Sequence, residues 1–464
     1  MYWEKINSEK NTNASRREID WVDKKFPRSD RIIKIRKILS LTSFVSTVLG
    51  ISWAACYFMY ARFELALVFV GLSLVGVLSY FASKKFNYIL FVVIANSLLI
   101  VIAAISFYDT PLPYVPRSAH VFFLPLAMGV VFIFNQNDKY MGKVFPKICL
   151  LFFAAFGIGI LDSIHLENSP PENIRMVGAY SNYIFSVLLL LCIIRIYRND
   201  MNEKASLGLD LAQAVAKNEI VVHYQPQVDE QQRILGIEAL VRWQHPERGL
   251  LSPDKFIPLA EESLLIREIG LEVLRQSCQL LNQWANDPVL KNKYIAVNVS
   301  PLQLDDDDFV AAVKQVILDA EVSPENIELE LTESAQCVSM EDAKKKMQAL
   351  QDFGVRWALD DFGAGFSSLG ILSVLPVHRL KIDRQFVKEI EHSASSIKLL
   401  KKVLEISEVM GMTATVEGVE NASQFKMLTG LGCKNFQGYL FGRPQSAETV
   451  TNAIKVNALS SFTS

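Results

Sequence analysis

Long charge-free runs of apolar residues are confined to the first part of the chain. Most of them are long enough to cross a membrane as a helix, and they occupy Ile38–Tyr60, Leu65–Ser83, Tyr88–Tyr108, Ala119–Asn135 and Met176–Ile194. A sixth run, Ile148–Leu161, is shorter than the ~20 residues a spanning helix needs, unless Lys147 snorkels and the span starts near Val144. A buried core helix would explain one such run but not a series. The pattern therefore predicts a helical membrane domain.

Positive charges between these runs predict its orientation. Lys and Arg residues precede the first run and follow the second, the fourth and the last, at Arg31, Lys34, Arg36, Lys37, Lys84, Lys85, Lys139, Lys143, Lys147, Arg195 and Arg198. The opposite loops carry only Arg62, Arg117 and Arg175. Because cytoplasmic loops are enriched in Lys and Arg, both ends of the region are expected in the cytoplasm. An even number of crossings follows, and we predict six helices.

This reading divides the chain into four parts. We expect a polar cytoplasmic N-terminus over residues 1–37, a six-helix sensory membrane domain over 38–198, a short linker over 199–206 and a soluble domain over 207–464. The membrane runs carry no array of charged residues that would mark a transport path, which disfavours a transporter.

After the linker, short β-rich runs alternate with longer amphipathic helical patterns. The strand candidates are "IVVHYQP", "ILGIEALVRW", "YIAVNVS", "IELELTE", "VRWALDD", "RLKID", "TATVEG" and "FQGYLFG". Eight strands alternating with helices over roughly 260 residues predict an α/β domain built as a (β/α)8 barrel of the TIM type.

The predicted strands end on polar residues. These are Glu238, Asn298, Glu330, Asp360, Asp361, Lys381, Glu417 and Gln437. Active sites of such barrels are built where the strands end, and carboxylates gathered there repel each other unless cations neutralise them. Oxygen ligands without Cys or His select Mg²⁺ or Mn²⁺. Five carboxylates and one amide exceed the needs of a single ion and fit two.

Two metal ions a few ångströms apart suit attack of water on a phosphodiester, with Lys381 holding the water or offsetting phosphoryl charge. A lone Asp-Asp pair such as Asp360 and Asp361 is usually a solvated acidic turn, so the pair alone does not indicate a metal. The six cysteines lie far apart without a Cys-x-x-Cys pair, so neither a zinc site nor a disulfide framework is indicated. A net charge of -2 gives no electrostatic argument for a nucleic-acid polymer as partner. The residues alone thus predict a two-metal phosphodiesterase.

An ordered series of fragments over Leu207 to Val456 resembles the EAL family of cyclic-di-GMP phosphodiesterases. The tripeptide Glu238-Ala239-Leu240 means little alone, because Glu-Ala-Leu is common in helices. The order of the fragments is specific: "YQP", "EALVRW", "SPDKFIPLAEE", "VNVS", "ELTES", "DDFGAGFSSL", "LKID", "VEGVE" and "QGYLFGRP".

The resemblance implies a barrel with one antiparallel strand that cuts cyclic-di-GMP to linear pGpG, as a homodimer at the bacterial inner membrane. The metal ligands it implies are Glu238, Asn298, Glu330 and Asp360 for one ion, with Asp361 for the second. Glu238, Lys381 and Glu417 would be catalytic, Lys381 positioning the attacking water and Glu417 lying close to the second metal. Gln225 and Gln437 would line the site, and Arg242 would contact a substrate phosphate.

The same resemblance implies a regulatory segment after the paired aspartates, which links the metals to the dimer interface. Glu333 would steady it, and Gly363 and Gly365 would let the backbone turn sharply. The alternative to an enzyme is a degenerate domain that binds cyclic-di-GMP and signals through its membrane part. Degeneration normally removes metal ligands, and every ligand position is occupied here, which favours the enzyme.

Overall fold

The computed structural model describes residues 28–84, 88–109, 111, 114–134, 138–160, 172–332, 339–363 and 369–460. The chain forms two compact units, Met1–Ala205 and Ser206–Ser464. Each unit has its own cluster of buried apolar side chains.

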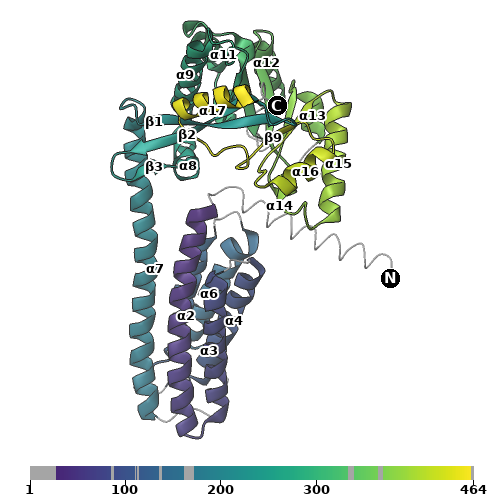
Figure 1. The fold of residues 1–464 in the computed structure, drawn as a ribbon. Helices are drawn as coiled ribbons and strands as arrows, with labels where there is room; N and C mark the ends of the chain where they lie inside the picture. The colour runs from purple at the N-terminus through teal and green to yellow at the C-terminus, as the bar shows by residue number, and fades with distance from the viewer. Residues whose placement is uncertain are drawn as a thin grey trace. The chain divides into compact units, whose positions relative to one another are not determined.

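The first unit is helical (Figure 1). Its elements are α2 (Arg28–Met59), α3 (Phe63–Lys84), α4 (Tyr88–Tyr108), the 3₁₀ turn η1 (Ala119–Phe122), α5 (Phe123–Ile133), the π-helical η2 (Lys139–Val144), α6 (Phe145–Gly157) and α7 (Glu172–Ala214). Among the described residues, five helical stretches are long and apolar enough to cross a membrane: Ile35–Met59, Phe63–Lys84, Tyr88–Tyr108, Lys139–Gly157 and Ile174–Ala214.

The sequence predicted Ile148–Leu161 as the shortest membrane helix, but a different run is the shortest in the structure. The run that starts at Ile148 belongs to a longer apolar helix, Lys139–Gly157, because the Asp138 side chain accepts a hydrogen bond from the Met141 backbone N–H and starts the helix earlier. The fourth predicted run is helical only over Ala119–Ile133 and is shorter than the others. The structure therefore supports a membrane domain with five apolar helices, and six crossings are not confirmed.

The residues predicted as a linker, 199–206, are helical, because they are part of α7, which is continuous to Ala214. The last turns of α7 belong to the second unit. There Leu211 and Ala214 are fully buried against Trp243 and Phe256.

The second unit is a closed barrel of eight strands, as predicted. The strands are β1 (Ile220–Asp229), β2 (Ile234–His245), β4 (Tyr294–Val299), β5 (Ile327–Thr332), β6 (Arg356–Phe362), β7 (Arg379–Ile382), β8 (Thr413–Val416) and β9 (Asn435–Gln437). Strand β1 pairs antiparallel with both β2 and β9 and closes the barrel, while the other neighbours pair in parallel. A short strand, β3 (Gly249–Leu251), extends the edge of β2. The single antiparallel strand that the resemblance implied is thus confirmed.

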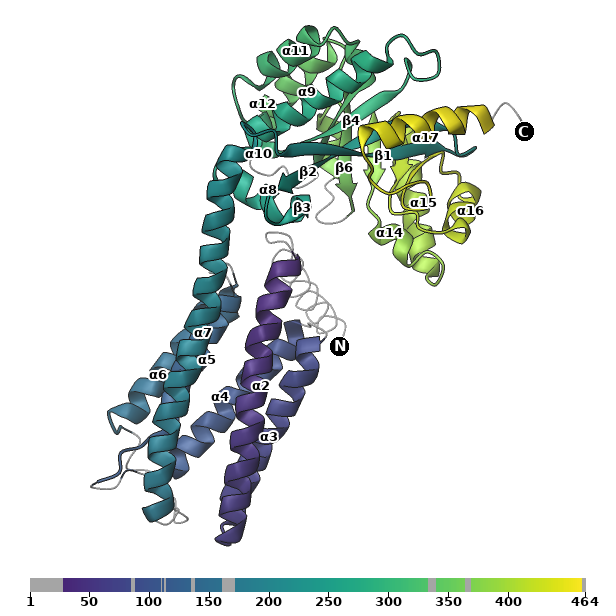
Figure 2. The same cartoon turned by 60° about the vertical axis from the view of Figure 1, so that its left-hand side comes forward.

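Helices cover the outside of the barrel. They are α8 (Pro253–Glu262), α9 (Ile266–Trp284), α10 (Pro301–Leu304), α11 (Phe309–Asp319), η3 (Pro324–Asn326), α12 (Met340–Gln351), α13 (Leu369–Val374), α14 (Gln385–Lys388), α15 (Ala394–Val409), α16 (Ala422–Gly430) and α17 (Ala447–Ser460). Figure 2 shows α9, α11 and α12 together on one side. Their apolar faces pack on the strands, as Val273, Cys278 and Leu281 of α9 do. The last strand is shorter than predicted, because residues 438–441 form a turn.

Candidate metal centre at the ends of the barrel strands

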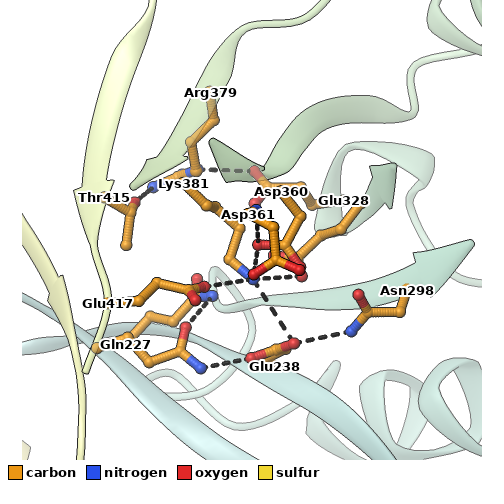
Figure 3. Close-up of polar contacts among 12 residues, drawn as sticks. Gln227, Glu238, Asn298, Glu328, Asp360, Asp361, Arg379, Lys381, Thr415 and Glu417 are labelled. Carbon is orange, nitrogen blue, oxygen red and sulfur yellow. Dashed lines mark hydrogen bonds and ion pairs between the residues drawn. The ribbon is translucent and has the colours of Figure 1, made fainter. Parts of the chain in front are cut away.

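The closed barrel gathers the polar residues of several strands around one buried lysine. Glu238, which was predicted at a strand end, lies within β2, because that strand continues to His245. Lys381 of β7 is fully buried, and Figure 3 shows carboxylates from several strands converging on it. Its Nζ atom lies 2.5 Å from Glu330 Oε2, 2.8 Å from Glu417 Oε1, 3.3 Å from Asp360 Oδ1 and 3.6 Å from Glu238 Oε1. Burial alone lowers the pKa of a lysine, but the four carboxylates outweigh it and raise the pKa of Lys381. The ammonium group therefore stays charged at the centre of the cluster.

A bulge in β6 brings two successive aspartates to the same place. Leu359 pairs with Leu380 and Phe362 pairs with Ile382, so Asp360 and Asp361 together face a single residue of β7. Asp361 has a φ of 57°, in the left-handed region, and its backbone N–H donates to Asp360 Oδ1 over 2.8 Å. In a regular strand these neighbours would point to opposite faces. The bulge is what lets both carboxylates serve one site.

The carboxylates form two groups that share a member. Oxygen atoms of Glu238, Glu330 and Asp360 lie within 4.8 Å of one another, and so do oxygen atoms of Asp360, Asp361 and Glu417. Each group could hold a metal ion.

The residues present fit a bound divalent cation. Glu330 Oε1 is buried and has no hydrogen-bond partner among the described residues. Burial, opposed by Lys381 and reinforced by neighbouring carboxylates, raises the pKa of Glu330 and of Glu417 well above the ordinary range. Burial and the Asp360 carboxylate raise the pKa of Asp361 to about 7. One lysine does not balance five carboxylates, and further positive charge would stabilise their ionised forms.

Amide side chains fix the position of Glu238. Asn298 Nδ2 donates to Glu238 Oε1 over 2.7 Å, and Gln437 Nε2 donates to Glu238 Oε2. Burial raises the pKa of Glu238, but Lys381 and these two hydrogen bonds outweigh burial and lower it. Glu238 is therefore held ionised, and the Asn298 amide lies beside it.

The residues predicted to contact substrate lie next to this group. Gln437 Nε2 also donates to Gln225 Oε1 over 3.2 Å, and Gln225 Nε2 donates to the Gly442 carbonyl over 3.0 Å. Arg242 is half-buried on β2, four residues beyond Glu238 and on the same face of the strand. A phosphate bound near Glu238 would thus have one guanidinium and two amides on its β1–β2–β9 side.

The regulatory segment is only partly described. Gly363 follows β6 with a φ of 90°, where a residue with a side chain is strained. Glu333 and Gly365 lie outside the described residues.

Sequence reasoning missed several residues that support the centre. Asp383 is buried two residues after Lys381, and its charge helps to raise the pKa of Asp361. The fragment "LKID" already contained it. Gln227 Nε2 donates to Gln437 Oε1 over 2.8 Å, and Gln227 in turn accepts a hydrogen bond from the Tyr294 hydroxyl. No sequence motif indicated this series of hydrogen bonds, because Gln227, Tyr294 and Gln437 come from three different strands.

A second buried ion pair, Glu328 with Arg379, lies two positions earlier on the strands that carry Glu330 and Lys381. Glu328 precedes Glu330 by two residues, and Arg379 precedes Lys381 by two, so each points to the same side of the sheet as its partner. Arg379 Nε donates to Glu328 Oε2 over 3.0 Å, and Arg379 Nη1 donates to Thr415 Oγ1 over 3.1 Å (Figure 3). This ion pair lies next to the carboxylate cluster on the same two strands.

Comparison with known proteins places the second unit among related domains. Residues 209–444 match the family described as the EAL domain. The bifunctional diguanylate cyclase/cyclic di-GMP phosphodiesterase MucR of Pseudomonas aeruginosa is 36% identical over 263 residues, 56% of this chain. The cyclic di-GMP phosphodiesterase PdeR of Escherichia coli is 34% identical over 256 residues, 54% of this chain. The chain spans only 38% of the length of each.

A solved structure extends the likeness to the fold. The solved PaMucR phosphodiesterase in complex with c-di-GMP matches 53% of this chain and 99% of its own length, with a TM-score of 0.51 and 37% sequence identity. The residues around Lys381 thus lie in a barrel that resembles one solved with this cyclic dinucleotide.

Proposed function

The chain belongs to the EAL domain family, and from this premise we propose that it hydrolyses cyclic-di-GMP to linear pGpG with two bound divalent metal ions, Mg²⁺ or Mn²⁺. The observation that carries the proposal is the pair of carboxylate groups that share Asp360 around a buried lysine. Relatives named as cyclic di-GMP phosphodiesterases support the choice of substrate.

The two groups divide the ligands. In this proposal Glu238, Asn298, Glu330 and Asp360 hold one ion, and Asp361 with Asp360 holds the second. The bound ions supply positive charge that activates a water molecule and stabilises the phosphoryl oxygens. All other contributions come from the chain.

Lys381 links the two carboxylate groups, because its ammonium contacts Glu238 and Glu330 in the first group and Glu417 in the second. The same ammonium lies where it can orient the attacking water. Glu417 is suited to accept the proton of that water, because burial raises its pKa. Arg242, Gln225 and Gln437 would hold the dinucleotide phosphates and ribose against β1 and β2.

We extend the proposal to the cellular setting. The apolar helices anchor the enzyme in the bacterial inner membrane, with the N-terminus and the barrel in the cytoplasm. The barrels pair as a homodimer, and the segment that contains Glu333, Gly363 and Gly365 couples the metal centre to the dimer interface.

The test is hydrolysis by the full chain in nanodiscs. Cyclic-di-GMP is incubated with Mg²⁺ or Mn²⁺, and pGpG is separated by chromatography. Glu238→Gln keeps the shape and the hydrogen bond from Asn298 but removes the charge that holds the metal. We expect its rate to fall by about a hundredfold or more. Glu230→Gln is the matched control, because Glu230 is exposed in the β1–β2 turn, and it should keep the full rate.

Three outcomes would overturn the proposal. They are hydrolysis that persists in EDTA, hydrolysis that Glu238→Gln leaves intact, and tight cyclic-di-GMP binding without any product. The last outcome would identify the chain as a receptor.

A further inference from the structure

The helices of the membrane unit enclose a small polar pocket at one end. Side chains from α2, α3, α4 and α7 line it, together with residues just before and in η1. The polar ones include Tyr57, Asp109, Ser118, Arg175 and Asn182. This is the end where α2 ends and α7 begins, opposite the lysine- and arginine-rich end.

Arg175 lines this pocket, and two of its guanidinium nitrogens lack a hydrogen-bond acceptor in the part of the chain that the structure describes. Arg175 is only 5% exposed, and its Nε and Nη2 atoms have no hydrogen-bond acceptor among the described residues. An arginine side chain cannot escape burial by losing its proton, because its pKa is far above neutral. A buried cation of this kind calls for an anion or strongly bound water.

The nearest carboxylate is already used. Asp109 Oδ2 accepts hydrogen bonds from Ser118 N over 2.6 Å, from Ser118 Oγ over 3.0 Å and from Ala119 N over 2.9 Å. These bonds tie the end of α4 to the start of η1. In the part of the chain that the structure describes, no ion pair joins Asp109 to Arg175.

A second arginine near the pocket has contacts of its own. Arg117 is 4% exposed, donates from Nε to the Asp109 carbonyl over 2.9 Å and lies 5.0 Å from the Phe156 ring centre. Glu172 lies one turn before Arg175 and is exposed, so solvent screens its charge. The ligand that complements the Arg175 guanidinium is therefore an anion.

An apolar cavity continues from the polar pocket. The two share Trp53, Phe69, Ile105, Ala119 and Asn182 in their linings. The polar pocket has a volume of about 30 Å³ and the apolar cavity about 110 Å³. Together the two connected spaces approach the ~150 Å³ of an apolar cavity that accepts benzene, so they have room for a short hydrocarbon body.

We propose that the membrane unit binds a small carboxylate-bearing amphiphile. Its carboxylate pairs with the Arg175 guanidinium, and its hydrocarbon body fills the cavity beside Ala95 and Leu98. Arg175 and Asn182 belong to α7, whose last turns are packed in the second unit. Occupancy of the pocket therefore acts on the helix that continues into the barrel. This proposal is independent of the reaction in the barrel.

The test measures binding and not hydrolysis. The full chain in phosphatidylcholine nanodiscs is titrated with radiolabelled octanoate, and unlabelled octanol, acetate and inorganic phosphate are the competitors. Arg175→Gln should weaken octanoate binding at least about tenfold, since it removes a charge-assisted pair. Arg195→Gln makes the same change on an exposed arginine of the same helix and should leave binding unchanged.

A second variant tests the binding site without removing the buried arginine, in case Arg175→Gln does not fold. Ala95→Leu fills part of the apolar cavity and leaves Arg175 in place, so it should weaken octanoate binding as well. Competition by phosphatidylglycerol in the nanodisc would show that a lipid phosphate occupies the site and would overturn the carboxylate assignment. Equal competition by octanol, or by phosphate or acetate, would overturn the proposal. Unchanged binding in folded Arg175→Gln would overturn it too.

Discussion

Replacing the buried lysine of the metal centre with an apolar residue of similar length, Lys381→Met, isolates its electrostatic role. Lys381 is fully buried and contacts four carboxylates at distances from 2.5 to 3.6 Å. At an effective dielectric constant near 20, each contact is a gross attraction of about 5 kcal/mol. The variant keeps the packing of the stem and leaves these carboxylates without their common cation.

The net loss is smaller than the sum of these attractions, because a carboxylate can bind a proton instead. Protonating a carboxyl group with an ordinary pKa near 4.5 at pH 7.5 costs about 4 kcal/mol, three pH units at 1.4 each. Breaking a buried ion pair costs about 3–5 kcal/mol. We therefore expect the free energy of unfolding of the barrel in EDTA to fall by about 4 kcal/mol at pH 7.5. For a domain of this size that is a drop in Tm of about 10 °C.

The loss should depend on pH with a defined sign. In the variant, the carboxyl that binds the proton has a higher pKa in the folded barrel than in the unfolded chain. The folded state then holds more protons, so stability falls as pH rises. Lowering the pH from 7.5 to 5.5 should recover about 3 kcal/mol, two pH units at 1.4 each.

Intrinsic fluorescence during thermal unfolding measures this effect on the full chain in detergent. Trp243, Trp284 and Trp357 are all buried in the barrel and report its unfolding. Mn²⁺ should raise the Tm of the variant more than that of the wild type, because the ion replaces part of the missing charge. Lys402→Met is the matched control, since Lys402 is exposed on α15 and should change Tm by no more than about 2 °C.

An unfolding temperature of Lys381→Met equal to that of the wild type at pH 7.5 in EDTA would refute this charge balance. So would a stability deficit that is as large at pH 5.5 as at pH 7.5. In either case the carboxylates would not depend on the lysine for their charge balance.

Other predictions concern the second metal, the turn after it and the long helix. Since the pKa of Asp361 is raised to about 7, protons compete with the metal below that pH. The Mn²⁺ affinity measured by calorimetry should fall up to about tenfold per pH unit below pH 7 and level off above it. An affinity that stays constant between about pH 6 and 8 would contradict this. Gly363→Ala should lower stability by about 1–3 kcal/mol in thermal unfolding, because φ is 90° and the new Cβ would lie 2.1 Å from Phe386 Cε2; an unchanged Tm would refute the strain. A Gly/Ser insertion after Arg198 interrupts α7 and should abolish any effect of octanoate on cyclic-di-GMP hydrolysis, with a retained response as the contrary result.

Much of the barrel could be predicted from local pattern. The alternation of β-rich runs and amphipathic helices is a short-range property, and all eight predicted strands are present. The polar residues of the strands were visible for the same reason, because Asp360 directly follows the apolar run Trp357–Leu359 and Glu238 interrupts an apolar run. Closure of the barrel then brings residues that are about 120 positions apart within 4.8 Å of one another.

Local pattern failed where hydrogen bonds outside the run set an element's limits. The helix from Lys139 starts early because Asp138 caps it, and Tyr88 from another helix donates to that same carboxylate over 2.9 Å. The predicted strand that begins at Phe436 ends already at Gln437, because residues 438–441 form a turn.

The sequence by itself determined which residue types stand at the strand ends and therefore the chemistry they can support. The tertiary structure decided how these groups share charge. Only the β6 bulge turns Asp360 and Asp361 toward one site, and only barrel closure puts a fully buried Lys381 between four carboxylates. Local periodicity contains neither fact, since a bulge is defined by pairing with a neighbouring strand and burial by the whole fold.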